Sequence, residues 1–271
     1  MPKTIDLRLG KEPLMCLFKG RAKTRKTTAA ASFPGPIYFC DCDGRIDVVK
    51  KEFPNRNDID YDSFTDFNDI ISKKNEFLSS CPYKTIVFPD SLTYFVEALM
   101  NYQINTRGGN AKTSSGKVHK KKGEISLLEI DDYMGETRML SELIDDLKII
   151  RLKHKINVIV TAHIIEKEIK NMKGEVTERQ QYLIAYGSKV VDKIPAAFNE
   201  VYHFYTEEAF EVGKNSKYLI KTQSTGKDFA GTCLPGLPPI IDWTDKNFYQ
   251  ILMSYVKTEE SIQQPTILEY S

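Results

Sequence analysis

Hydrophobic and polar residues alternate along the first 163 residues in blocks that predict strands and helices in turn. Short runs of almost entirely apolar residues predict buried strands, and apolar residues at helical spacing predict helices between them. The strands are expected at residues 14–18, 37–40, 84–88 and 157–162. The helices are expected at residues 27–33, 63–80, 92–104 and 133–155. Strands that are apolar on both faces and alternate with helices are typical of a parallel sheet covered by helices on both sides.

The pattern changes after residue 163, where shorter strand-like runs with turn signals become frequent. Residues 164–169 and 181–184 are expected to pair as a hairpin around residues 171–174. Further strands are expected at residues 200–206, 210–212 and 218–222, and a closing helix at 245–257. We therefore predict a single α/β domain with a β-rich C-terminal extension and a flexible tail. The corresponding ranges are 1–257 for the domain, about 12–163 for its core, about 164–257 for the extension and 258–271 for the tail.

Composition and charge are typical of a soluble globular protein. The chain has 271 residues, of which 41% are hydrophobic and 28% charged, which is enough to bury a substantial core. The net charge of +1 means that any contact with nucleic acid must use local basic patches. The five cysteines are scattered, and the Cys40-x-Cys42 pair lacks the second half of a zinc motif. No apolar run approaches the ~20 residues that span a bilayer and no signal peptide is recognised, so we expect a cytoplasmic protein without membrane contact.

A phosphate-binding loop is the most informative motif of the chain. Such a loop has a glycine, four variable residues and then Gly-Lys-Thr or Gly-Lys-Ser. Its backbone N–H groups surround phosphate oxygens, its lysine contacts the outer phosphates and its hydroxyl binds Mg²⁺. Gly20, Lys26 and Thr27 stand at the required offsets, between a predicted strand and a predicted helix. The candidate nucleotide-binding residues are Gly20, Arg21, Ala22, Lys23, Thr24, Arg25, Lys26, Thr27 and Thr28. Without the flanking strand and helix, an ordinary basic loop would explain the sequence equally well.

Arg25 stands where the motif has its second glycine. That position normally takes a left-handed backbone, and a side chain there costs roughly 1 kcal/mol. We expect the substitution to weaken the match without abolishing it. We also expect the Arg25 guanidinium to lie close to the phosphates, where its charge would replace part of the missing glycine geometry.

Polar residues close each of the other predicted core strands. Asp41 and Asp43 follow the second strand, Asp90 and Ser91 the third, and His163 the fourth. Because the carboxyl ends of parallel strands form the ligand-binding edge of an α/β sheet, these side chains are expected to meet the loop. Singly, each has an ordinary explanation, since an aspartate after a strand often caps a helix and a lone histidine is usually a satisfied polar residue. Their shared edge favours a nucleotide site with Asp90 as a Mg²⁺ ligand.

In this order the motifs resemble the RecA-like ATPase core, over about residues 14–232. The segments that carry the resemblance are Gly20 to Thr27, Asp41-Cys42-Asp43, residues 86–91 and residues 158–163. The chain is similar to the phage-encoded AAA-type, RecA-like P-loop ATPase family that includes single-strand annealing recombinases. Residues 133–140 are also similar to the start of the helix that follows the first DNA-binding loop of RecA.

The resemblance implies ATP and Mg²⁺ as cofactors and a role for several residues. Lys26 would contact the β- and γ-phosphates, and Thr27 with Asp90 would hold Mg²⁺. Asp43 would orient the attacking water. Two departures from the family pattern, Arg25 for glycine and Asp43 for glutamate, put fast hydrolysis in doubt more than binding. A weak ATPase is therefore expected.

The resemblance also implies residues that connect the nucleotide to partners. His163 falls at the polar sensor position that couples the γ-phosphate to DNA-binding loops, so Asp43, Asp90 and His163 are the candidate catalytic residues. Lys227 falls near the place where related proteins offer a basic residue to the nucleotide of a neighbouring subunit. A homo-oligomer, either a ring or a filament, is expected on the same ground.

Two basic segments are candidates for contact with nucleic acid. Residues 107–123 contain no acidic residue, are rich in glycine and serine, and occupy the position of the first DNA-binding loop. The hairpin after His163 occupies the position of the second, and Tyr182 there could stack on a base. The candidate DNA-binding lysines are Lys112, Lys117, Lys120, Lys121, Lys122, Lys170 and Lys173. For each segment a plain solvated surface is the alternative.

These observations predict an ATP-binding, RecA-like protein that acts on single-stranded DNA in phage recombination or annealing, in the host cytoplasm. A phage single-strand-binding protein is a further expected partner. Two alternatives remain open: a non-catalytic, nucleotide-gated binding protein, and a helicase-loader or assembly-type ATPase acting on a protein partner. Turnover measured with and without single-stranded DNA distinguishes the three.

Overall fold

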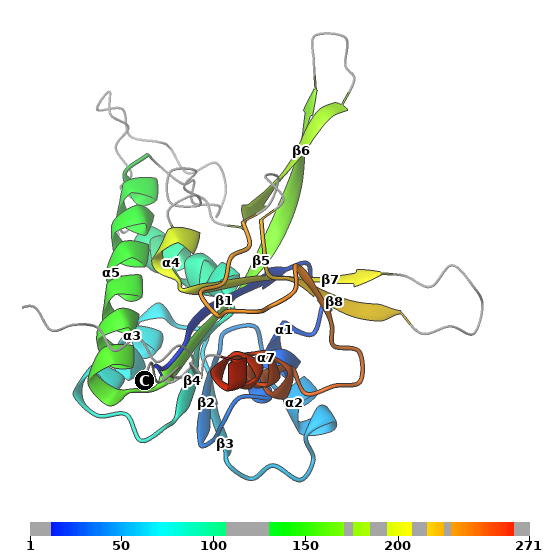
Figure 1. Ribbon diagram of the computed structural model, residues 1–271. Helices are drawn as coiled ribbons and strands as arrows, with labels where there is room; N and C mark the ends of the chain where they lie inside the picture. The colour runs from blue at the N-terminus through cyan, green and yellow to red at the C-terminus, as the bar shows by residue number, and fades with distance from the viewer. Residues whose placement is uncertain are drawn as a thin grey trace, which may run out of the picture.

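Helices and strands alternate through most of the chain (Figure 1). The computed structural model describes residues 12–106, 130–170, 176–184, 194–207, 216–224 and 229–262. The strands are β1 (Met15–Gly20), β2 (Ile37–Asp41), β3 (Ile59–Ser63), β4 (Thr85–Asp90), β5 (Asn157–Lys170), β6 (Val176–Leu183), β7 (Glu200–Glu207), β8 (Lys217–Lys221) and β9 (Ile240–Asp242). The helices are α1 (Lys26–Ala31), α2 (Asp47–Glu52), α3 (Phe67–Ser79), α4 (Leu92–Thr106), α5 (Ile130–His154), the short 3-10 helix η1 (Pro195–Ala197) and α7 (Phe248–Ile262).

The described strands form one sheet in the order β3-β2-β4-β5-β1-β7-β8-β9, and β6 pairs with the outer part of β5. The pairs from β3 to β7 are parallel, whereas β8 and β9 continue the sheet in antiparallel fashion. The mostly parallel sheet predicted from the apolar runs is confirmed. In this order β5 separates β1 from β4, although β4 precedes β5 in the chain.

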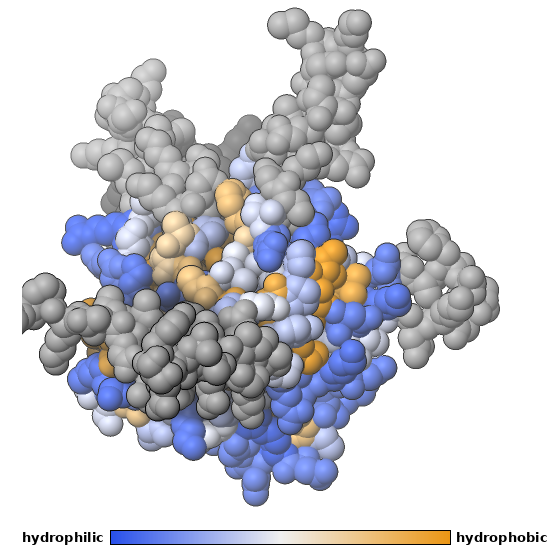
Figure 2. All heavy atoms as spheres, in the orientation of Figure 1, coloured by the Kyte–Doolittle hydropathy of each residue, from blue (hydrophilic) through white to orange (hydrophobic). Residues whose placement is uncertain are grey.

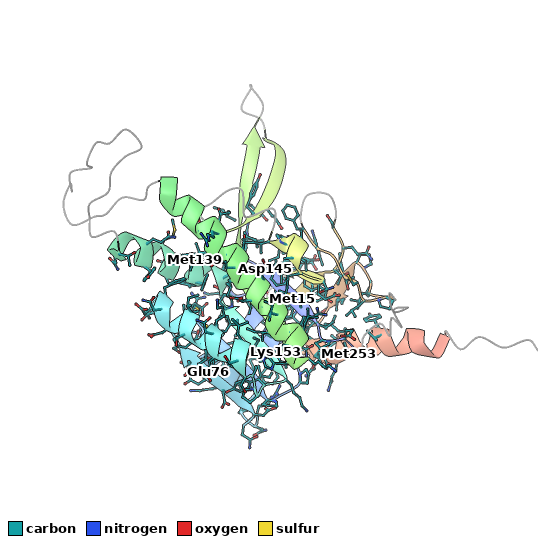
Figure 3. All side chains as sticks on the ribbon, turned by 90° about the vertical axis from the view of Figure 1, so that its left-hand side faces the viewer. Met15, Glu76, Met139, Asp145, Lys153 and Met253 are labelled. Atoms are coloured by element: carbon teal, nitrogen blue, oxygen red, sulfur yellow. The ribbon has the colours of Figure 1, made fainter. Side chains whose placement is uncertain are left out.

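Helices cover both faces of the sheet. On one face Leu17 of β1 belongs to a buried cluster with side chains of α3, α4 and α5, such as Phe95. Figure 3 shows α5 lying across this face. On the other face Phe18 packs against Phe248 of α7 with ring centroids 5.6 Å apart, in a cluster that also contains residues of α1. Because both faces are covered, polar groups that must remain accessible lie at the ends of the strands.

Four described elements were not predicted: α2, β3, η1 and β9. β3 pairs with β2 alone at one margin of the sheet and its side chains are mostly exposed, so its sequence has no apolar run. The helix predicted over residues 63–80 begins at Phe67 instead, because Ser63 still belongs to β3. The Asp66 carboxylate accepts a hydrogen bond from the Asn68 backbone N–H at 2.7 Å, which caps the start of α3.

The β-rich C-terminal part is continuous with the main sheet. The predicted boundary near residue 164 lies inside β5, which runs from the core into the hairpin without a break. The hairpin itself is confirmed, with Ile164 opposite Leu183. Strand β7 lies parallel and adjacent to β1, so this part of the chain extends the core sheet rather than adding a separate layer.

The C-terminal helix is longer than predicted. Helix α7 runs to Ile262, five residues past the predicted end of the helix at residue 257. Residues 263–271 and the strand predicted at 210–212 lie outside the described residues.

The face in Figure 2 is mostly hydrophilic where the chain is described, with hydrophobic side chains gathered in small patches. The large apolar side chains that are exposed in the described residues are Val48, Tyr61, Ile149, Leu152, Ile165, Ile184, Phe229 and Ile240. Among the described helices, none combines the length and the apolar character that crossing a membrane requires.

Candidate functional site

The loop between β1 and α1 is held tightly against the neighbouring strand. A Cβ atom on Gly20 would lie 2.2 Å from the carbonyl oxygen of Phe204 in β7, so only glycine fits there. The Thr24 hydroxyl donates to the carbonyl oxygen of Arg21 at 2.9 Å and closes the loop into a turn. The strand, loop and helix that the motif requires are all present in this order.

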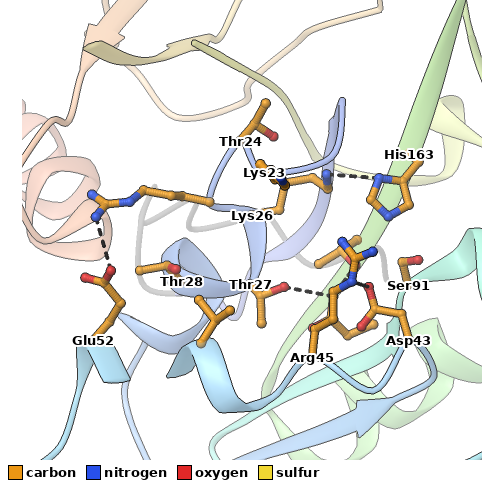
Figure 4. A pocket seen from close by; sticks show the side chains of 14 residues that line it. Lys23, Thr24, Lys26, Thr27, Thr28, Asp43, Arg45, Glu52, Ser91 and His163 are labelled. Carbon is orange, nitrogen blue, oxygen red and sulfur yellow. Dashed lines mark hydrogen bonds and ion pairs between the residues drawn. The ribbon is translucent and has the colours of Figure 1, made fainter. Parts of the chain in front are cut away.

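Lys26 turns its ammonium group back into this loop (Figure 4). Its Nζ donates to the carbonyl oxygens of Gly20 and Arg21 at 3.0 and 2.9 Å and lies 3.4 Å from Nδ1 of His163. Burial lowers the pKa of Lys26 to about 8, and the nearby carboxylates of Asp90 and Asp43 oppose this shift. The ammonium is therefore a buried cation that a bound anion beside the loop would stabilise.

Thr27 and Asp90 place a hydroxyl and a carboxylate side by side. The Thr27 hydroxyl donates to Oδ1 of Asp90 at 3.3 Å, and the hydroxyl of Thr161 in β5 donates to the same oxygen. Burial raises the pKa of Asp90, while these two hydrogen bonds lower it. Such a pair fits Mg²⁺, which proteins usually hold through one or two carboxylates together with substrate phosphates. Thr27 and Asp90 can thus hold a Mg²⁺ that arrives with a nucleotide, and Thr161 orients the carboxylate.

The two aspartates at the end of β2 have different surroundings. Asp41 accepts hydrogen bonds from the backbone N–H of Arg45 at 3.1 Å and from the hydroxyl of Ser63 at 3.0 Å, so both of its oxygens hold the turn. Oδ2 of Asp43 lies 3.9 Å from Nε of Arg45, and its buried Oδ1 has no hydrogen-bond partner among the described residues. Burial raises the pKa of Asp43 to about 7, and the charge of Asp90 adds to this shift. Asp43, rather than Asp41, can therefore accept a hydrogen bond from water.

His163 closes the same space at the end of the core part of β5. It stands opposite Gly20 in the strand register, and its backbone N–H donates to the hydroxyl of Thr93 at 3.1 Å. Burial lowers the pKa of His163 to about 4, and the positive charges of Lys26 and Arg45 lower it further. The imidazole is therefore neutral near pH 7 and can form a hydrogen bond without adding charge.

One pocket brings together loop residues 23–28 with Asp43, Asp90 and His163. The sheet and its helices agree with a P-loop NTPase fold, and a family model described as an AAA domain matches residues 12–233. The chain belongs to this AAA domain family. Membership indicates an AAA-type P-loop ATPase that binds nucleotide, typically with Mg²⁺. No curated protein matches the chain.

The AAA domain accommodates Arg25 at the glycine position through two side-chain contacts. The Arg25 backbone is left-handed, with φ of 63° and ψ of 28°, which costs roughly 1 kcal/mol relative to glycine. The guanidinium donates to Oε1 of Glu52 in α2 at 3.1 Å and lies 4.3 Å from the ring centroid of Tyr218 in β8. These contacts offset part of the strain. The expectation that Arg25 lies at the phosphates stays a prediction. Its guanidinium contacts Glu52 and Tyr218, and both Arg25 and Glu52 line the same pocket as Lys26.

Four pocket residues of the AAA domain were missed in the sequence: Arg45, Val48, Glu52 and Thr161. Thr161 looks like an ordinary member of an apolar strand, and only the position of β5 beside β4 brings its hydroxyl to Asp90. Arg45 lies in the loop between β2 and α2 and belongs to none of the motifs identified in the sequence. The available signal was its position two residues after Asp43, at the carboxyl edge where the other site residues were expected.

Several predicted contacts lie outside the described part of the AAA domain. They are Lys112, Lys117, Lys120, Lys121, Lys122, Lys173 and Lys227. Lys170 is the last residue of β5, and only its backbone is described. Contacts of these residues with DNA or with a neighbouring subunit stay predictions.

Proposed function

We propose that this AAA domain hydrolyses ATP with Mg²⁺ and uses the reaction to control contact with single-stranded DNA. The convergence of Lys26, Thr27, Asp43, Asp90 and His163 on one pocket at the carboxyl edge of the sheet carries the first half of the proposal. A cation, a hydroxyl, two carboxylates and a neutral imidazole supply the positioning and the charge that phosphoryl transfer needs. The resemblance to RecA-like ATPases supports the same roles.

Each side chain has one task in the proposed reaction. Lys26 exchanges its carbonyl contacts in the loop for β- and γ-phosphate oxygens. Thr27 and Asp90 hold Mg²⁺, which neutralises charge on the phosphates. Asp43 orients a water molecule and accepts its proton as the water oxygen bonds to the γ-phosphorus and the bond to the bridging oxygen breaks. The products are ADP and inorganic phosphate, and His163 forms a hydrogen bond with the terminal phosphate.

The kcat/KM of ATP hydrolysis is expected to have a bell-shaped dependence on pH. Asp43 must be ionised to accept a proton, so activity rises through about pH 7 as this carboxyl titrates. Lys26 must be protonated to bind phosphate, so activity falls above about pH 8. Phosphate release measured across this range at constant ionic strength checks both limbs.

Asp43→Asn should lower turnover at every pH and remove the acidic limb. Asp47→Asn is a matched control, because the Asp47 side chain is 88% exposed and pairs only with Lys50 among the described residues. A parent profile without an acidic limb, or an Asp43→Asn profile that keeps one, would contradict the assignment of Asp43.

The second half of the proposal rests on the connection between the pocket and the β5–β6 hairpin. Strand β5 carries His163 at the pocket and continues as far as Lys170. Figure 1 shows the hairpin projecting away from the body of the domain. A shift of His163 on loss of the terminal phosphate would act on the base of this hairpin. The basic residues 107–123 supply charge for phosphate contacts.

Together with the RecA-like resemblance, these features support a role in phage single-strand annealing or recombination. In this proposal several copies assemble as a ring or filament, with Lys227 reaching the neighbouring nucleotide, and a phage single-strand-binding protein is a further partner. A nucleotide-gated binding protein without turnover and an ATPase that acts on a protein partner are the alternative outcomes.

Replacing Lys120, Lys121 and Lys122 together with alanine should weaken binding to single-stranded DNA of any sequence. The logarithm of the DNA-binding constant falls linearly with the logarithm of the salt concentration. Each lost phosphate contact should make this slope less steep by roughly 0.7. Fluorescence anisotropy across a salt series measures both effects. A triple variant at Lys148, Lys155 and Lys246 removes the same charge elsewhere on the chain and should leave binding unchanged. Suppose that the parent and the Lys120–Lys122 variant bind single-stranded DNA equally well and that DNA does not stimulate ATP hydrolysis. This result would favour a protein as the partner over single-stranded DNA.

A further inference from the structure

Arg45 is placed beside the pocket by its backbone. Gly44 has a φ of 68°, a left-handed conformation that turns the chain immediately after Asp43. The Arg45 backbone N–H then donates to Oδ1 of Asp41 at 3.1 Å, and the Arg45 carbonyl oxygen accepts from the Val48 backbone N–H at 3.2 Å. Both contacts belong to the main chain, so the position of the residue is set independently of its side chain.

The Arg45 guanidinium is weakly engaged. Its Nε lies 3.9 Å from Oδ2 of Asp43, at the outer limit of an ion pair, and this is its only ion pair or hydrogen bond among the described residues. The side chain is 49% exposed. A guanidinium has five N–H donors in a planar fork that suits phosphate oxygens, and most of these donors are available here.

Two positive groups, Lys26 and Arg45, line the pocket together with His163. Figure 4 shows the Arg45 side chain extending toward Lys26 and His163. Its charge lowers the pKa of both groups, which shows that they lie within electrostatic reach of each other. Two cations and a neutral imidazole around one space, with Asp43 beside them, form a site that an anion would complete.

Arg45 also stands where the nucleotide pocket meets a second cavity. Both cavities include Arg45 and His163, and the second is further lined by Tyr94 and by Ile165 and Ile184 at the base of the β5–β6 hairpin. Loop residues 23–28 line only the first of these two cavities, whereas Arg21 and Ala22 of the same loop line the second. Arg45 therefore lies where the two cavities meet, whereas Lys26 lines only the first.

We infer that Arg45 binds the γ-phosphate and allows the site to distinguish a nucleoside triphosphate from a diphosphate. This inference rests on the proposed function and deepens it, because it assigns the recognition of the terminal phosphate to a residue of the same chain. Lys26 contacts the terminal phosphate from the loop side and Arg45 from the β2 side. ADP leaves Arg45 with only its long contact to Asp43, so the two nucleotides differ by one guanidinium–phosphate interaction.

The test compares a non-hydrolysable ATP analogue with ADP by calorimetry in the presence of Mg²⁺. Arg45→Ala should weaken binding of the analogue by about 10- to 100-fold, the range expected for a charged hydrogen bond, and weaken ADP less than about 3-fold. Arg45→Lys keeps the charge but loses the planar fork, and it should give an intermediate loss. Both variants keep the backbone contact to Asp41, and thermal unfolding verifies that each is folded.

Arg138→Ala is the matched control, because Arg138 lies on α5 with its side chain 81% exposed and pairs with Glu142. It removes the same charge and should change neither affinity. Equal losses for the analogue and ADP in Arg45→Ala, or no loss for either, would overturn the inference. If the parent protein bound neither nucleotide, the proposed function would be overturned instead. Failure of the inference and failure of the proposed function are therefore distinguishable.

Discussion

Replacing Lys26 with alanine is expected to weaken the binding of Mg²⁺·ATP by about 150-fold or more. The parent ammonium is buried and already lies among the loop carbonyl oxygens of Gly20 and Arg21, within reach of His163. A lysine in this position gives two charged hydrogen bonds to phosphate, each contributing roughly 1.5–3 kcal/mol. The cation next to it in sequence, Arg25, is paired with Glu52. Isothermal titration calorimetry measures the loss directly.

Lys51→Ala provides the control for general charge effects. Lys51 is an exposed lysine of α2, and its replacement removes the same charge without touching the loop. Its affinity for nucleotide should stay within about 3-fold of the parent. An unchanged affinity in Lys26→Ala, with the variant folded by thermal unfolding, would remove the loop as the nucleotide site.

Replacing Glu200 with alanine is expected to lower the free energy of unfolding by about 3–5 kcal/mol, through a cluster remote from the nucleotide. Glu200 is buried in β7, next to β1. Its Oε2 accepts from the Tyr202 and Thr232 hydroxyls, each at 2.5 Å, and its Oε1 accepts from the Cys233 backbone N–H at 3.0 Å. Alanine leaves three donors without their acceptor, at about 1–3 kcal/mol for each donor that stays buried. Urea unfolding followed by circular dichroism measures the change.

Glu200→Gln separates the charge of Glu200 from its hydrogen bonds. Burial raises the pKa of Glu200, and the hydrogen bonds from Thr232, Tyr202 and the Cys233 backbone oppose the shift. A carboxyl whose pKa is higher in the folded state contributes stability below its unfolded pKa and loses it as pH rises through the folded value. Glutamine does not ionise, so the variant does not lose stability in this way. The difference in free energy of unfolding between the parent and Glu200→Gln should therefore become smaller as pH rises.

Glu207→Ala is the control on the same strand. Glu207 is exposed at the end of β7, opposite Lys217, and its replacement should cost less than about 1 kcal/mol. A cost for Glu200→Ala no larger than that of Glu207→Ala would show that the buried carboxylate does not connect β7 to the segment around Thr232.

The loop and the main elements were predictable because their signals are local. The offsets among Gly20, Lys26 and Thr27 describe one continuous turn, and a buried strand such as β1 or β4 is marked by its own apolar residues. Strand β3 gave no such signal, because a strand at the margin of a sheet has exposed side chains and needs no apolar run.

The edge of the sheet at which the site forms was also predictable from the sequence. The hydrogen-bond partners of the individual site residues were not. Asp43, Asp90 and His163 follow apolar strands, and parallel strands bring their carboxyl ends to one edge. Sequence spacing does not distinguish Asp41 from Asp43. The tertiary structure does, because the Ser63 hydroxyl of β3 and the Arg45 backbone N–H occupy the oxygens of Asp41.

Local patterns in the chain are sufficient to predict the strand–loop–helix motif, the apolar strands and the polar residues that close them. The position of β5 between β1 and β4, which brings Thr161 to Asp90, and the contacts of Arg25 with α2 and β8 are visible in the folded domain alone. The physical reason is that hydrophobic periodicity records which face of an element is buried, whereas neighbours in a sheet and partners of a charged side chain come from segments far apart in the chain. Their pairing is selected by packing and hydrogen bonding of the whole fold.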